Sequence, residues 1–504
     1  MLAPDYLDHA PDRLVLLWQQ MEDDILRDVA RRISKMETLT PTANWQLWRY
    51  QQTEAVRQDV IKKLARYTGK SESAIRQLMQ EAATRALEAE DQIYYHYNME
   101  PTPFEDSAAL QALLNAGYAQ TAGTFRNLTG TTANTVSGQF EAALDRAHLK
   151  VSSGAFDYKS AIKSAVDSLA DTMKYVTYPT GHQDTLEVAA RRAVLTGVNQ
   201  TAGKLQVARA DEMGVEFFAV TAHGGARPSH AAWQGKTYHR GGAVDYLGKH
   251  YEDFESVTGY GTGAGLCGWN CRHTFFAIFP ELGAPPAWTQ ESLDALNARD
   301  IEYDGKKYTQ YEINQMQRAR ERTVRKYKRR YLAEDAAGAD TTQSAVKLRA
   351  ARAELADFTA RTGGRVDSAR TMVSGFGRSQ SSKATWAAKK QERLDAVNND
   401  LTELRQSGKI RMTGAAVVPP ILPNTLNFEG HSLEQMAKRQ ISLAQANEIA
   451  EHAILAISQR NGTQHSYYSD KGFIVIKQDG SIGTVGWLDD GGKQIVEVMK
   501  KHGF

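Results

Sequence analysis

The chain has 504 residues and a net charge of +2, and 41% of its residues are hydrophobic. That length allows two to four domains with cores of their own, and that composition excludes a chain that is disordered throughout. The near-neutral charge excludes nucleic-acid binding through bulk charge alone. The sequence has only two cysteines, which excludes a disulfide scaffold and is typical of a cytoplasmic protein.

The first residues form neither a basic nor an apolar segment, so we expect no signal peptide. No run of about 18 apolar residues occurs, so we expect no membrane-spanning helix.

Residues 1–214 have helical periodicity throughout, and we expect them to form a helical body. In the first long helix, apolar residues recur at steps of four and share one face: Leu17, Met21, Ile25, Val29 and Ile33. A second helix is predicted over 43–67, ended by Gly69, and a third is predicted to be capped by Ser71 or Ser73. The second helix should direct these residues inward: Leu47, Val56, Val60, Ile61 and Leu64.

Further helices are predicted near 106–121, 131–147, 158–174 and 184–213. The Gly- and Thr-rich stretch 128–132 is predicted to be a loop between two of them.

Residues 215–335, the Cys/His module, differ in composition from the helical body. Short aromatic runs at 216–221 and 275–279 predict strands, and the stretch 223–265 is rich in Gly, His and Tyr. We therefore expect a loop-rich α+β module.

Both cysteines lie in this module, near several histidines. Residues 225–236 read Gly-Ala-Arg-Pro-Ser-His-Ala-Ala-Trp-Gln-Gly-Lys, and residues 265–273 read Gly-Leu-Cys-Gly-Trp-Asn-Cys-Arg-His. Zinc prefers tetrahedral thiolate and imidazole ligands. A plausible set of four ligands is His230, Cys267, Cys271 and His273, and alternatives for the fourth ligand are His223, His239 and His250.

Two readings of these residues need no metal. In the first, the cysteines are small buried residues in a packed turn in which His230 bonds to the backbone, and in the second they form a disulfide. In each case we expect the turn that joins the two motifs to be held by four further residues: Arg227, Trp233, Gly235 and Arg272.

Residues 318–330 hold eight basic residues and one acidic residue. On a helix these charges would be distributed over all faces rather than gathered on one. They indicate either a solvated helix that pairs with acidic neighbours or a contact with packaged DNA or an acidic partner surface.

Residues 336–424 are expected to be a flexible and helical linker. A helix is predicted over 343–360, broken by Gly363 and Gly364, and residues 365–382 are small and polar, which is typical of a hinge. A short charged helix near 384–407 precedes a proline-rich extended segment at 417–423.

Residues 425–504 are expected to form a separate α+β domain. One helix begins at His431, and a second is capped by Ser442 and predicted to continue through Ile457. Strands are predicted at 467–468, 472–476 and 482–487, with a hairpin turn at 478–481.

The two motifs of the Cys/His module, together with Asp23–Ile33 and Trp45–Arg49 in the helical body, resemble the tailed-phage minor capsid protein 2 family, which is related to Mu-type head morphogenesis proteins. The resemblance covers about residues 10–330 and implies a structural role. It implies a virion protein inside the capsid near the portal, made in the host cytoplasm, with portal and major capsid proteins as partners in head assembly and in DNA packaging or delivery.

The last domain resembles the barnase–EndoU–colicin–RelE-like nucleases, through His431, Arg439 and residues 467–472. Such domains cleave RNA without a metal, which needs an acid–base pair and a cation near the phosphorane. Candidate catalytic residues are His431, Arg439, Tyr468 and Lys471, with Ser469 as a further hydrogen-bonding group and His452 and His465 as spare histidines.

The expected fold is therefore multidomain and mainly α, with α+β modules, and the expected protein is a structural component of a phage or prophage head. One alternative is a phage-delivered ribonuclease toxin for which the capsid part is a vehicle. Another is a zinc-stabilised nucleic-acid-binding protein.

Overall fold

The computed structural model describes residues 1–36, 42–153, 157–173, 176–178, 181–283, 286–418 and 426–504. It divides into two compact units, Met1–Ser381 and Ser382–Phe504. The expected mainly helical character with small sheets is confirmed. Among the described residues, no helix is long and apolar enough to cross a membrane.

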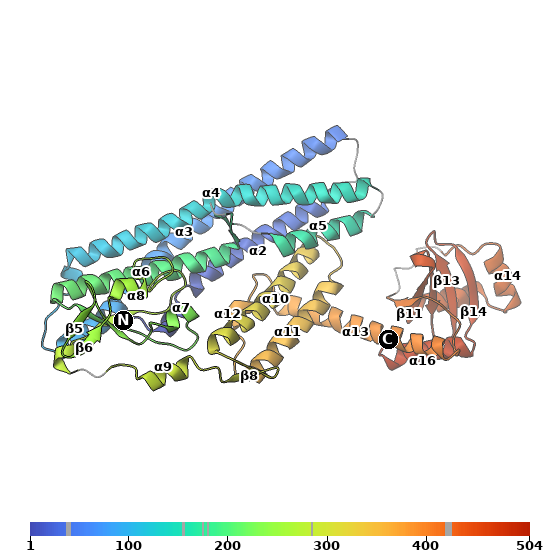
Figure 1. Ribbon diagram of the computed structural model, residues 1–504. Coiled ribbons are helices and arrows are strands. Elements are labelled where there is room, and N and C mark those ends of the chain that lie inside the picture. Colours follow the sequence, from blue (N-terminus) through green and yellow to red (C-terminus); the bar gives the residue numbers. More distant parts are fainter. Residues whose placement is uncertain (37–41, 154–156, 174–175, 179–180, 284–285, 419–425) are drawn as a thin grey trace. The chain divides into compact units, whose positions relative to one another are not determined.

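Helices build the N-terminal part of the first unit (Figure 1), and α3 and α4 lie side by side while α6 packs against both. The elements of this part are α1 Pro4–His9, α2 Asp12–Ser34, α3 Thr42–His96, η1 Phe104–Asp106, α4 Ala108–Ser152, α5 Tyr158–Thr172, β1 Val176–Thr177, β2 Gln183–Asp184 and α6 Leu186–Met213.

Helix α3 continues through the expected break at Gly69, so the predicted second and third helices are one. A helical glycine costs only about 1 kcal/mol relative to alanine, which packing of the flanking turns can outweigh. Ser71 is not a cap. Its hydroxyl donates to the carbonyl of Tyr67 at 2.8 Å and accepts from the buried Trp18 indole at 2.9 Å.

The expected loop at 128–132 is also helical, and it lies within α4. Helices α4 and α6 meet closely at two glycines. A Cβ atom on Gly117 would lie 2.1 Å from Oγ1 of Thr201, and one on Gly197 would lie 2.2 Å from Oγ1 of Thr121. Each threonine hydroxyl donates to a glycine carbonyl in its own helix, Thr121 to Gly117 at 2.9 Å and Thr201 to Gly197 at 2.7 Å.

The core of the helical part follows the predicted apolar stripes with two exceptions. In α2 the predicted residues from Met21 to Ile33 are buried, and Leu17 is half-buried. In α3, Leu47 and Ile61 are 59% and 42% exposed. Their expected burial is wrong because nine residues of helix, at 100° each, place Leu47 opposite the buried Val56.

A three-stranded antiparallel sheet of order β4-β3-β7 forms the centre of the Cys/His module, and both predicted strands are present in shorter form. The module also has two hairpins: β5-β6, which contacts the sheet at β4, and β8-β9, which contacts the next two helices of the chain. The elements are β3 Phe217–Val220, α7 Pro228–Ala231, β4 Thr237–His239, β5 Val244–Tyr246, β6 Lys249–Tyr251, α8 Phe254–Thr258, β7 Phe275–Ala277, η2 Pro280–Leu282, α9 Gln290–Leu296, β8 Ile301–Tyr303 and β9 Lys306–Tyr308.

Three further helices complete the first unit: α10 Gln310–Ala336, α11 Thr342–Thr362 and α12 Ser368–Thr371. Gly363 ends α11 with a φ of 69°, as predicted. The expected hinge at 365–382 lies almost entirely within the first unit, which extends to Ser381. Thr371 and Val373 are buried there, and the next helix, α13, already begins at Arg378.

The second unit is a five-stranded antiparallel meander of order β10-β11-β12-β13-β14 with helices on both faces. The elements are α13 Arg378–Gln406, β10 Ala415–Val417, α14 His431–Lys438, α15 Leu443–Glu451, β11 Leu455–Gln459, η3 Arg460–Gly462, β12 Gln464–Tyr468, β13 Gly472–Lys477, β14 Ile482–Trp487 and α16 Asp490–Lys501. Helices α14 and α15 cover one face, and α13 and α16 cover the other.

The caps and turn predicted for this unit are present. Ser442 caps α15 in a capping box with Gln445, and the turn at 478–481 joins β13 to β14. The predicted helix through Ile457 is wrong beyond Glu451, because residues 455–459 pair with β12 as a strand. Most of the predicted extended segment 417–423 lies outside the described residues.

Candidate functional site

The Cys/His cluster is held where α6, α7 and the loop before β7 meet. His230 lies on α7, while Cys271 and His273 lie on the loop. The Asn199 side chain of α6 donates to the carbonyls of Cys271 and His273, both at 3.0 Å. This buried amide fixes the loop against the helix.

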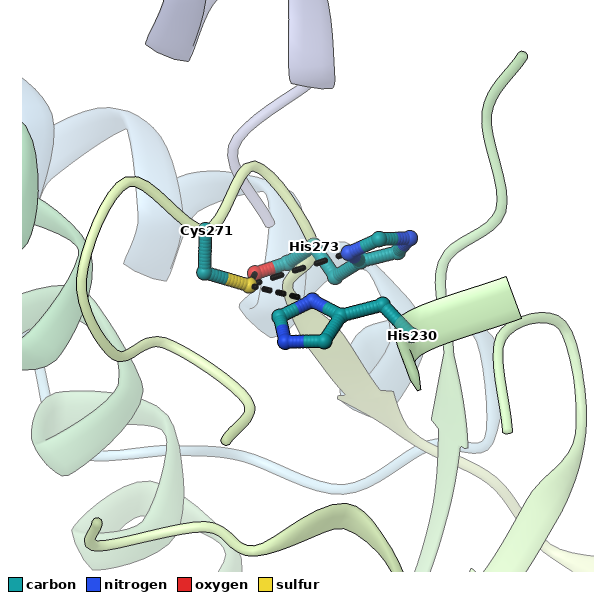
Figure 2. A group of neighbouring side chains, drawn as sticks. All are labelled: His230, Cys271 and His273. Atoms are coloured by element: carbon teal, nitrogen blue, oxygen red, sulfur yellow. Dashed lines mark hydrogen bonds between the residues drawn. The ribbon is translucent and has the colours of Figure 1, made fainter. Parts of the chain in front are cut away.

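Figure 2 shows Cys271 Sγ facing both imidazoles. Its sulfur lies 3.7 Å from Nδ1 of His230 and 3.7 Å from Nδ1 of His273. Ligand atoms of these three residues lie within 4.8 Å of one another, and all three residues are buried. The structure therefore brings together three of the four predicted metal ligands.

The fourth predicted ligand, Cys267, is not part of this group. It is buried in the same core with a φ of 57°, and its thiol lies 3.7 Å from the carbonyl of His273. Of the three alternatives, His239 and His250 bond elsewhere, to the carbonyl of Gly242 and to Asp245. His223 lies closer, with its ring 4.3 Å from that of His273, but its Nδ1 lies 3.0 Å from the carbonyl of Gly224 and it is not part of the group. Within the described part of the chain, the predicted four-ligand set is therefore reduced to three.

Gln234 determines which nitrogen of His273 carries the proton. The backbone N–H of His223 donates to Oε1 of Gln234 at 3.1 Å, which identifies that atom as the acceptor. Nε2 of His273 lies 2.9 Å from the same oxygen and must donate to it. The lone pair of His273 Nδ1 is therefore directed at Cys271.

Burial keeps the cluster uncharged. It lowers the pKa of His230 to about 4 and that of His273 well below its ordinary value, and nearby charges reinforce the second shift. Burial also raises the pKa of the Cys271 thiol. Neutral imidazoles are competent metal ligands as they stand, whereas the thiol must lose its proton on binding.

Two of the four residues expected to join the two motifs, Arg227 and Trp233, do so, whereas Gly235 packs against Leu293 of α9. Arg227 donates to the carbonyl of Trp269 at 3.0 Å, and Trp233 packs on the rings of His230 and His273. Gly235 has a φ of 70° and is so close to Leu293 that a Cβ atom would lie 2.4 Å from it.

The fourth, Arg272, instead pairs with Asp8 of α1 at 2.7 Å. Gln234 and Asn199, which orient the cluster, were not predicted. Gln234 lies inside the first motif, so the sequence could have indicated its role. Asn199 is a single asparagine in a predicted helix, and nothing in the sequence around it indicates a role in the site.

The cluster lies in the wall of a cavity of about 800 Å³. Nine Arg and Lys residues line the cavity against five Asp and Glu residues. The cations come from α6, from the two motifs, from α10 and from α12: Arg191, Arg227, Arg272, Arg318, Arg322, Arg325, Lys326, Arg329 and Arg370. A concave site with excess positive charge suits an anionic ligand.

The predicted basic segment 318–330 lies in α10 and pairs mostly with carboxylates of the first unit. Arg330 pairs with Asp167 at 2.5 Å, Lys326 with Asp171 at 3.2 Å, and Arg325 with Glu187. Arg329 reaches Glu22 and Asp23 in α2. The segment thus holds helices together, in agreement with the alternative of pairing with acidic neighbours, although it is packed rather than solvated.

The four predicted catalytic residues of the second unit are not brought together. Cross-strand pairing places Tyr468 on the face with Leu455 and Phe473, covered by α13 and α16. Helix α14, which begins at the exposed His431, covers the opposite face.

The side chains of these residues also have structural partners. The Tyr468 hydroxyl donates to Sδ of Met412 at 2.9 Å, and Arg439 donates to the carbonyl of Val485 at 2.5 Å on β14. Lys471 is exposed and pairs with Glu448 at 2.5 Å.

The family model of phage minor capsid protein 2 matches residues 2–360. A comparison with curated proteins and one with solved structures found no match. The match defines a component of the bacteriophage particle with a structural role in the head. The chain belongs to the phage minor capsid protein 2 family, which confirms that part of the resemblance and implies a location in the virion.

Proposed function

We propose that the chain acts in head assembly at the portal vertex, on the inner side of the capsid, and that the first unit makes the contact with the portal or coat protein. The observation that carries this proposal is the agreement between the family match, residues 2–360, and the compact first unit, Met1–Ser381. The family role thus belongs to a folded body with its own core.

The docking surface we propose is the end of the α3–α4 pair, where α3 begins and α4 ends. Arg49 pairs with Asp145 at 2.6 Å, and the rings of Trp45 and His148 stack at 4.5 Å, so the two helices are joined there. Leu47 is 59% exposed on this end, and Leu149 is 67% exposed. Exposed apolar residues at one end of a rigid helix pair are typical of a protein interface.

Exposed glutamates on this end should block incorporation into the head. Procapsids would be assembled from coat protein, portal and the full-length chain carrying Leu47→Glu or Leu149→Glu, and the chain would be measured in purified particles. We expect at least about a tenfold loss, because a charge is buried without a partner at the interface. The matched control is Leu247→Glu, at a leucine 66% exposed in the Cys/His module. Equal incorporation of all three variants would refute the docking surface.

The contacts of the second unit do not favour the ribonuclease alternative. The Tyr468 side chain and the helix that begins at His431 lie on opposite faces of the sheet, and Arg439 joins α14 to the edge strand β14. We also do not assign DNA contact to the basic segment 318–330, because its charges are mostly paired with carboxylates of the first unit.

A further inference from the structure

The sulfur of the Cys/His cluster lies from each imidazole nitrogen at the distance expected for two ligands of one zinc ion, and the three ligand atoms lie within 4.8 Å of one another. Zinc binds thiolate sulfur at about 2.3 Å and imidazole nitrogen at about 2.0–2.1 Å, so a tetrahedral angle separates the two ligands by about 3.6 Å. Cys271 Sγ lies 3.7 Å from Nδ1 of each histidine. An ion would therefore fit between them with little movement of the side chains.

A hydrogen bond holds one of the two histidines in the state that metal binding requires. Gln234 accepts the Nε2 proton of His273, so Nδ1 offers a lone pair. Nε2 of His230 lies 2.9 Å from the carbonyl of Ala264 and accepts from Nε of Arg227 at 2.8 Å, so binding of metal at its Nδ1 requires Arg227 to turn away and Nε2 to donate to Ala264. Metal-bound histidines commonly donate their other ring N–H to a carbonyl or side-chain oxygen in this manner.

Only three protein ligands converge, which is the pattern of zinc sites that keep one position open. Cys267 is absent from the group of ligand atoms found among the described residues. All three ligand residues line the 800 Å³ cavity. The open position therefore faces a space large enough for a small ligand.

The cavity contains more positive charge than its own carboxylates neutralise. Asp8 accepts from Arg272 at 2.7 Å and from Arg370 at 3.1 Å. Arg318 lies close to both guanidinium groups, which together with burial lower its pKa to about 10, and no carboxylate pairs with it in the part of the chain that is described. Arg370 also pairs with Asp367 at 2.7 Å, so Arg318 is the one of these three arginines without an ion pair among the described residues.

We propose that His230, Cys271 and His273 bind a zinc ion, and that a phosphate group from the arginine-lined cavity completes its coordination. Guanidinium groups bind phosphate oxygens through paired, charge-assisted hydrogen bonds, and a metal ion with an open position takes one oxygen directly. The site is independent of the docking surface on α3 and α4. The proposed site combines a metal ion held by residues of the Cys/His motifs with cationic side chains from α10 and α12.

The metal is tested on the full-length chain. Elemental analysis should give about one equivalent of zinc, and X-ray absorption at the zinc edge should give one sulfur neighbour. After exchange for cobalt, the thiolate-to-cobalt absorption band should be lost in Cys271→Ser and unchanged per cobalt in the matched control Cys267→Ser. Two sulfur neighbours, a weakened band in Cys267→Ser, or less than about a tenth of an equivalent of zinc would overturn the site.

The phosphate is tested on the cobalt-loaded chain with three probes: inorganic phosphate, a nucleoside monophosphate, and an oligonucleotide with or without a 5′-phosphate. Binding of any phosphate probe should shift the visible cobalt bands, and the probe that binds most tightly identifies the source. Arg318→Met should weaken binding about tenfold without loss of cobalt. The control is Arg299→Met, outside the cavity. No shift with any probe, or equal affinity in the two variants, would overturn the phosphate site.

Discussion

Replacing Arg329 by methionine should destabilise the first unit by about 3–5 kcal/mol, the usual cost of removing one partner from a buried ion pair. Arg329 pairs with Glu22 at 2.5 Å and with Asp23 at 2.8 Å, and the two carboxylates are 0% and 3% exposed. Methionine keeps most of the side-chain volume, so the loss is mainly that of charge. Asp23 retains the backbone N–H of Ser374 at 2.8 Å, and Glu22 retains that of Glu187 at 3.4 Å.

The loss of stability in the Arg329→Met variant should increase with pH. Burial raises the pKa of Glu22, and Arg329 is the strongest influence that opposes the shift. A carboxyl group whose pKa is raised in the folded state stabilises the fold at low pH and loses that contribution as pH rises through the folded pKa. Without Arg329 the pKa rises further, so the deficit of the variant should be larger at pH 8 than at pH 5.

Hydrogen exchange of the full-length chain, read on peptides from α2 and α10, measures this loss within the first unit. A loss of 3–5 kcal/mol raises the opening constant roughly a hundred- to several-thousand-fold. The control is Arg322→Met, on the same helix but exposed, which should change the free energy of unfolding by less than about 0.5 kcal/mol. Equal effects of the two substitutions, or a deficit that shrinks as pH rises, would refute the role assigned to Arg329.

Three further predictions concern buried groups. Ser71→Ala should cost about 1–3 kcal/mol in urea unfolding, because the buried Trp18 indole loses its acceptor at 2.9 Å. Burial lowers the pKa of the Lys328 amine from 10.5 to about 8, so the stability of the wild-type chain relative to Lys328→Met should fall as pH decreases from 10.5 to 8, as measured by thermal unfolding. Tyr468→Phe should cost less than about 1 kcal/mol by calorimetry of the second unit, because the Met412 sulfur is a weak acceptor.

Local patterns in the sequence predicted which residues form helices better than where helices end. The stripe from Met21 to Ile33 is buried as expected, and Ser442 caps its helix. Gly69 and the Gly- and Thr-rich stretch 128–132 have the composition of breaks, yet both are helical. In both helices, contacts with distant parts of the chain outweigh local propensity, and those contacts cannot be read from the residues around the glycines.

The sequence also predicted only part of the candidate site, because local motifs indicate the ligands but not the distant helices that surround them. The two motifs indicated His230, Cys271 and His273, because their residue types and close spacing are typical of metal ligands. That Cys267 lies apart depends on its left-handed backbone, with a φ of 57°, which the residue type does not suggest. The arginine cavity combines α6, α10 and α12 with the motifs, and no local pattern predicts which distant helices meet.

The crossing of α4 and α6 also determines the geometry of the Cys/His cluster. Asn199 lies on α6 midway between Gly197 and Thr201, the two residues at which α6 meets α4, and its amide sets the carbonyls of Cys271 and His273. A methyl group at Gly117 would clash with the Thr201 side chain, so Thr201 or the α6 backbone beside Asn199 would have to shift. We therefore expect a substitution in α4, which has no contact with the cluster, to change the geometry of His230, Cys271 and His273.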